Sequence, residues 1–173
     1  MMRKIITAIL ILVVFFYACE KDESSSGPAA PATPAATASF SAKVNGNTVY
    51  ADTVVAQLNI DTSLGIPFRV LVIAALCDTQ TILPGFIDTI NSTVPAVGDY
   101  SNSPLGFGSL GYYHGSDTIN EYFSSTAQFT ITTVDAANQK VSGTFSGIVV
   151  GDVSGDTIII TDGVFSNIHY EVW

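Results

Sequence analysis

The sequence predicts an all-β domain over residues 40–173, built as a single antiparallel β-sandwich or barrel of about eight to ten strands. Short runs alternate apolar and polar residues, as strands with one buried face do. Gly, Asn, Asp and Pro separate these runs, and no segment has the period of a long helix. The chain is 47% hydrophobic and only 12% charged, so it has enough apolar side chains for a core and is not expected to be mainly disordered.

The charge of the chain excludes one class of partner. Six Lys and Arg residues face fifteen Asp and Glu residues, which gives a formal net charge of −9. A nucleic-acid partner would require a basic patch that neutralises phosphates, so we expect none. The length of 173 residues suits one domain with an N-terminal extension better than a two-domain enzyme.

Residues 1–18 have the organisation of a secretory signal peptide. Met1–Lys4 is basic, and residues 5–17 form an uncharged apolar run that is too short for an ordinary transmembrane helix. Ala18 then precedes Cys19, and this order resembles a bacterial lipoprotein signal. The resemblance implies a lipid on Cys19 and a membrane anchor. An uncleaved anchor or an ordinary signal peptide is the alternative.

Residues 19–39 connect the expected anchor to the domain. The charged run after Cys19 resembles the Lys-plus-acidic export tag of surface lipoproteins of the Bacteroidota, which implies the outer face of the outer membrane. A solvated charge run at a chain terminus is the alternative. Residues 24–39 have a Pro at every third position from 28 to 34, which predicts a disordered, extended linker with ~3.1 Å per residue. The tag residues are Glu20, Lys21, Asp22 and Glu23.

The first strands of the domain can be placed in order. Phe40–Val44 alternates apolar and polar residues, Asn45-Gly46 indicates a tight turn, and residues 48–50 resume the strand pattern. Residues 54–60 form the next run. Phe68–Cys77 is β-branched and apolar on both faces, so we expect a central strand covered on both sides, with Cys77 as a small buried residue.

The last third of the chain predicts further strands. Residues 127–134 and 141–150 read as two strands, and residues 157–161 and 164–173 read as a final hairpin around Asp162-Gly163. One short helix is also predicted. Thr118 to Glu121 matches a capping box, and a turn or two would continue through Tyr122 and Phe123.

Three of these segments together resemble a group of β-rich lipoproteins of the Bacteroidota, a domain of unknown function. The segments are FSAKVNG at residues 40–46, followed by Tyr50; VSGTFSG at residues 141–147; and ITDGVF at residues 160–165. The resemblance implies the location and the fold. It supplies no catalytic residue.

One aromatic, glycine-rich segment is a candidate ligand-binding face. Rings with a polar tip beside a flexible backbone suit a sugar or a lipid, although they equally suit the core of a β domain. The candidate residues are Tyr100, Phe107, Tyr112, Tyr113, His114 and Tyr122.

Cofactor, metal and catalytic motifs are weak. Residues 106–111 read GxGxxG, but no helical pattern follows, so we expect a Gly-rich strand or loop and no cofactor. No serine has the G-x-S-x-G context of a hydrolase, and His114 and His169 are the candidate bases. Asp152 and Asp156 are a weak calcium candidate; the alternative is that they are ordinary turn residues.

Four Thr residues share an Asp-Thr-aliphatic context that resembles the O-glycosylation signal of exported Bacteroidota proteins. Asp ending a turn before a strand is the alternative. The four are Thr53, Thr89, Thr118 and Thr157.

These features predict an outer-membrane lipoprotein that faces the cell exterior and acts as a non-enzymatic binding or coat module. A glycan, a lipid or a surface protein is the expected partner. A lipocalin-like carrier of a small apolar ligand is the alternative, and a carbohydrate-acting hydrolase is a further one.

Overall fold

The computed structural model describes residues 37–61, 68–89, 93–101, 106–115 and 121–173. Residues 36–173 form a compact unit, and within the described ranges every regular element is a strand. The all-β prediction is confirmed. The expected signal, Cys19, export tag and linker lie outside the described residues.

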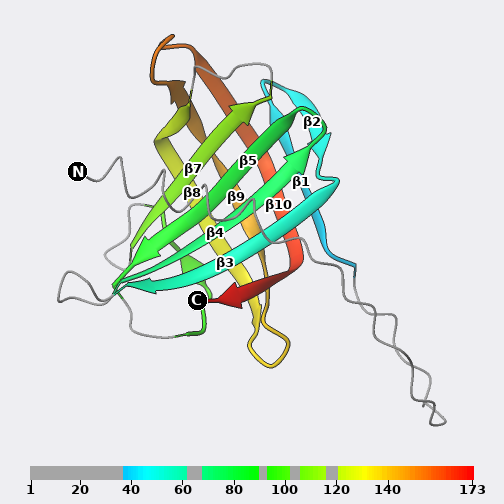
Figure 1. The fold of residues 1–173 in the computed structure, drawn as a ribbon, viewed down its shortest axis with the longest axis vertical. Coiled ribbons are helices and arrows are strands. Elements are labelled where there is room, and N and C mark those ends of the chain that lie inside the picture. Colours follow the sequence, from blue (N-terminus) through cyan, green and yellow to red (C-terminus); the bar gives the residue numbers. More distant parts are fainter. Residues whose placement is uncertain (1–36, 62–67, 90–92, 102–105, 116–120) are drawn as a thin grey trace. The chain divides into compact units, whose positions relative to one another are not determined.

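The described part of the domain contains ten strands (Figure 1). They are β1 (Ser39–Val44), β2 (Asn47–Tyr50), β3 (Thr53–Asp61), β4 (Phe68–Cys77), β5 (Gln80–Asp88), β6 (Gly98–Asp99), β7 (Gly106–His114), β8 (Tyr122–Asp135), β9 (Lys140–Gly151) and β10 (Thr157–Val172).

The ten strands belong to one sheet that curls back on itself. β3, β4, β5, β7, β8, β9 and β10 pair in succession, and a short pairing of β10 with β3 returns to the start. Within the described ranges, β7 and β8 share two residue pairs, and β10 and β3 share three, so the circuit is not a regular barrel. The β10–β3 pairing is parallel, and the other pairings are antiparallel. In Figure 1, β3, β4, β5 and β7 lie in front of β8, β9 and β10.

The first hairpin forms as predicted. β1 pairs with β2, and the turn between them contains Asn45 with φ 48° and Gly46 with φ 84°. Two successive positive φ angles define the tight turn that matches the twist of paired strands, and Asn followed by Gly tolerates them best. The turn also attaches to β10, because Asn45 Oδ1 accepts a hydrogen bond from the Ile159 backbone N–H at 2.9 Å.

The long apolar strand differs from expectation on one face. Burial alternates along β4, and the inward side chains include Leu71, Ile73 and Cys77. The other face is only partly covered, and Leu76 is 45% exposed. The prediction of cover on both sides is wrong because the sheet is a single curled layer, in which β4 packs between β3 and β5. Cys77 is buried as expected, and burial raises the pKa of its thiol to about 11.

The predicted final hairpin is one strand in the structure. β10 runs from Thr157 to Val172, and its pairing with β9 is irregular between Ile160 and Gly163. Asp162 takes a positive φ of 51°, so residues that read as a turn form a bulge inside a continuous strand. The short helix is also wrong where it can be checked, because Tyr122 and Phe123 begin β8; Thr118 lies outside the described residues.

Aromatic rings fill the space between the front and rear strands. The rings of Phe86, Phe129 and Phe165 are buried, with centroid separations of 5.8 Å and 5.3 Å along the series. Tyr100 extends the series, because its ring stacks on Phe86 with a centroid separation of 4.0 Å. These contacts join β5, β8 and β10, so the described centre of the curled sheet is a packed core.

Candidate functional site

The predicted aromatic ligand face is largely part of the core. Tyr100, Tyr112 and Tyr122 are at most 7% exposed, and the rings of Tyr112 and Tyr122 pack edge to face across β7 and β8. Each lies at a position of its strand or segment that points inward, so these three side chains do not form an exposed face. These three tyrosines pack in the core, which was the alternative interpretation.

The remaining residues of that predicted face behave differently. Tyr113 and His114 are half-buried at the end of β7, and the side chain of Phe107 lies outside the described residues. Burial, and then the charges of Glu121 and Asp152, raise the pKa of the Tyr113 phenol to about 12. Residues 106–111 belong to a strand, which is one of the two structures expected for this Gly-rich segment.

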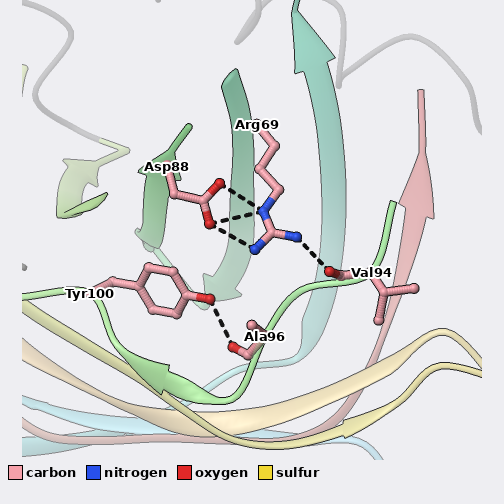
Figure 2. A network of polar contacts seen from close by, with 5 residues as sticks. All are labelled: Arg69, Asp88, Val94, Ala96 and Tyr100. Carbon is pink, nitrogen blue, oxygen red and sulfur yellow. Dashed lines mark hydrogen bonds and ion pairs between the residues drawn. The ribbon is translucent and has the colours of Figure 1, made fainter. Parts of the chain in front are cut away.

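A buried ion pair is the most highly connected polar group that we describe (Figure 2). Arg69 on β4 lies directly opposite Asp88 on β5, and both side chains have no solvent exposure. Arg69 Nε donates to the two carboxylate oxygens of Asp88 at 2.8 Å and 2.9 Å, and Arg69 Nη2 donates to Oδ2 at 2.7 Å. A paired, fork-like geometry of this kind is the strongest form of charge-assisted hydrogen bond.

The same guanidinium group holds the segment that precedes β6. Arg69 Nη1 donates to the backbone carbonyl of Val94, and the guanidinium carbon lies 5.7 Å from the centre of the Phe86 ring. Two residues further on, the Ala96 carbonyl accepts a hydrogen bond from the Tyr100 hydroxyl at 2.8 Å (Figure 2). Burial raises the pKa of Tyr100, so the hydroxyl keeps its proton and remains a donor. Since Nε, Nη1 and Nη2 all donate to protein atoms, this network has the features of a structural tether.

This network was missed in the sequence, although a signal was present. Arg69 opens an apolar run, and Asp88 was noted only for its Asp-Thr-Ile context. In an antiparallel hairpin, paired residue numbers have a constant sum, and here Cys77 pairs with Gln80. The same sum of 157 places Arg69 opposite Asp88. Recognising the turn at residues 78–79 would therefore have predicted the ion pair.

The three described candidate glycosylation sites are accessible. Thr53 is the first residue of β3, Thr157 is the first residue of β10, and Thr89 follows β5; all three are exposed. A surface glycan requires an exposed Thr, and the turn interpretation requires a Thr at the end of a strand. Both interpretations fit this placement. Thr118 lies outside the described residues.

The two candidate calcium ligands have roles within a turn. Asp152 Oδ1 accepts a hydrogen bond from the Glu121 backbone N–H at 3.1 Å, and the Asp156 backbone N–H donates to Ser154 Oγ at 3.1 Å. Gly155 in the same turn has a φ of 71°. Within the ranges that the structure describes, no group of three or more His, Cys, Asp and Glu side chains is placed to hold a metal ion.

The two histidines lie on different strands. His169 is exposed on β10, and its Nδ1 lies 3.2 Å from the backbone carbonyl oxygen of Asn138. His114 ends β7. His169 therefore contacts the turn between β8 and β9, which contains Asn138.

A shallow groove crosses the outer surface of β8, β9 and β10, and its described lining includes none of the residues singled out for binding in the sequence. Its polar groups are hydroxyls and one carboxamide, and its apolar groups are aliphatic. The main lining residues are Thr126, Gln128, Ser146, Ile148, Ile159 and Thr161. The sequence predicted strands in these regions, but not that three of them would place these six side chains together.

In the described ranges, no helix is long and apolar enough to cross a membrane. Comparison with known proteins gives no further constraint: no protein-family model, curated protein or solved structure matches this chain.

Proposed function

We propose that this chain is an outer-membrane lipoprotein, anchored at Cys19 and exposed at the cell surface, whose β domain is a non-enzymatic binding or coat module. The basic start, the short apolar run and the small residue before Cys19 support the anchor. Glu20–Glu23 supports export to the outer face. The residues after this run lead through the Pro-rich linker to a compact unit that begins at residue 36.

The packed interior of the domain is the main observation in favour of a binding or coat module. A carrier of a small apolar ligand requires a cavity inside the sheet. Here Phe86, Phe129, Phe165 and Tyr100 occupy the space between the front and rear strands. A ligand or a partner would therefore meet the domain from outside, which favours a binding or coat module over a lipocalin-like carrier.

The position of His169 also favours a non-enzymatic role. A hydrolase of the Ser-His-Asp type requires an imidazole that contacts a serine and a carboxylate within one cleft. The Nδ1 atom of His169 instead faces the carbonyl oxygen of Asn138, at an exposed position of β10.

The anchor is tested by separating the roles of the two cysteines in the mature chain. We expect Cys19→Ser to move the full-length protein from the membrane fraction to the soluble fraction, because the acyl chains would be lost. Cys77→Ala is the matched control and should leave the protein in membranes, since Cys77 is buried in the core. Membrane association of the Cys19→Ser protein that equals the wild type would refute the anchor.

Surface exposure is tested by adding protease to intact cells. A domain on the outer face is digested, whereas a domain in the periplasm is protected until the outer membrane is opened. Complete protection in intact cells would refute the outward orientation and leave the anchor intact.

A further inference from the structure

We propose that the groove across β8, β9 and β10 binds an extended, neutral polysaccharide. This inference rests on the proposed role as a binding module, and it adds a site and a class of ligand.

Two neighbouring rows of side chains form the groove. In the first row, Thr126 lies opposite Ile148, which lies opposite Ile159. In the second row, Gln128 lies opposite Ser146, and the Ser146 hydroxyl donates to Gln128 Oε1 at 3.2 Å. Thr161 continues the second row at the bulge of β10, where an extra residue changes the direction of the side chains.

The chemistry of the two rows matches a sugar. Hydroxyl and carboxamide groups both donate and accept hydrogen bonds, so Gln128, Ser146 and Thr161 can pair with the hydroxyls of a glycan. Ile148 and Ile159 lie beside them and provide an aliphatic surface for the C–H face of a pyranose ring. Ile159 is 49% exposed, so this surface is accessible to solvent.

Among the residues that the structure describes, none that lines the groove is charged, which argues against an ionic ligand. The closest charged residues along β10 and β1 are Asp162 and Lys43, and these pair with each other at 2.9 Å. The net charge of −9 also repels anions over a longer range. A neutral ligand avoids this repulsion.

The backbone around the groove disfavours an added peptide strand. β9 pairs with β8 on one side and with β10 on the other, so its N–H and C=O groups are already used in the ladder. Recognition by strand addition requires a free edge. A ligand here would therefore contact side chains, which repeat from strand to strand at about 4.8 Å. This spacing is close to the length of one unit in an extended glycan chain.

A matched pair of variants on β10 tests the groove. Ile159 and Val164 are 49% and 45% exposed, but only Ile159 lines the groove. We would titrate the full-length mature protein, purified in detergent, with cellohexaose, maltohexaose and mannohexaose in a calorimeter, using hexagalacturonate as the anionic comparison.

We expect at least one neutral hexasaccharide to bind the wild type and hexagalacturonate to bind less tightly. Ile159→Glu should weaken that binding by about tenfold or more, because a carboxylate under the ligand is desolvated without a partner. Val164→Glu should leave it within about twofold. Gln128→Ala is a second variant that removes one hydrogen-bonding group without adding a charge, and it should weaken binding by about three- to tenfold.

Three results would overturn the inference. The first is that no neutral hexasaccharide binds the wild type. The second is that the wild type and the two groove variants bind equally well. The third is that Val164→Glu weakens binding as much as Ile159→Glu does. None of them bears on the membrane anchor, which Cys19→Ser tests in the absence of any sugar.

Discussion

Two ion pairs of this domain have similar chemistry and opposite surroundings. Arg69 and Asp88 are buried at the end of the β4–β5 hairpin, with both side chains 0% exposed. Lys43 and Asp162 lie on the outer surface where β1 meets β10, with side chains 45% and 67% exposed, and their charged atoms are 2.9 Å apart. Distance alone therefore does not separate the two pairs.

The difference lies in what each pair would lose if it were broken. Removal of either buried partner leaves a charge in a place where water cannot reach it, and removal of Arg69 also takes away its hydrogen bond to the Val94 carbonyl. Removal of either surface partner leaves a charge that water solvates at once. The buried pair should therefore be needed for the fold, whereas the surface pair should be dispensable.

The largest effect is expected from breaking the buried pair on one side. Arg69→Met should lower the free energy of unfolding by about 3–5 kcal/mol, because Asp88 would remain buried without its partner. The double variant Arg69→Met/Asp88→Leu should recover most of this loss, since both charges are removed. Urea denaturation of the three proteins measures the difference. Equal stability of the single and double variants would show that the charge of Asp88 is not the cause.

A smaller effect is expected at the edge of the same network. Tyr100→Phe keeps the ring that stacks on Phe86 and removes only the hydroxyl that donates to the Ala96 carbonyl. We expect a loss of about 1 kcal/mol, as for one neutral hydrogen bond. Amide hydrogen exchange should speed up over residues 94–101 and not in β9. Unchanged exchange in residues 94–101 would mean that the Tyr100 hydroxyl is not needed to hold this segment.

The smallest effect is expected from the surface pair. Lys43→Met should leave the unfolding midpoint at pH 7 nearly unchanged. The hydrogen bond to Asp162, and then its charge, raise the pKa of Lys43 above 10.5. A raised pKa in the folded state adds stability below the unfolded pKa and loses it as pH rises through the folded pKa, so the contribution of the Lys43 charge is lost as pH rises above about 10.5. A large loss of stability at pH 7 would contradict the comparison.

Much of the fold followed from local patterns. The Asn45-Gly46 turn and the burial of Cys77 were predicted, because each depends on neighbours in sequence. The final strand was predicted incorrectly for the same reason. Asp162-Gly163 has the composition of a turn, and pairing with β9 and β1 before and after this bulge keeps it within β10.

The candidate sites, like the strands, depended on long-range pairing wherever local patterns left two interpretations open. Alternation could not decide whether Tyr100, Tyr112 and Tyr122 faced a ligand or the core, because an aromatic ring suits both. Burial depends on how far the sheet curls, and this is set by pairings between distant strands such as β3 and β10. The groove on β8, β9 and β10 depends on register between three strands in the same way.

The sequence by itself determined the strand content, the tight first turn and the acidic, weakly charged character of the chain, because these depend on the period and composition of short segments. Tertiary structure decided that the sheet curls into a single layer around stacked rings, that the segment before β6 packs onto the Arg69–Asp88 pair, and that the described lining of the outer groove carries no charge. These features require long-range strand pairing, which places residues together that no local pattern relates.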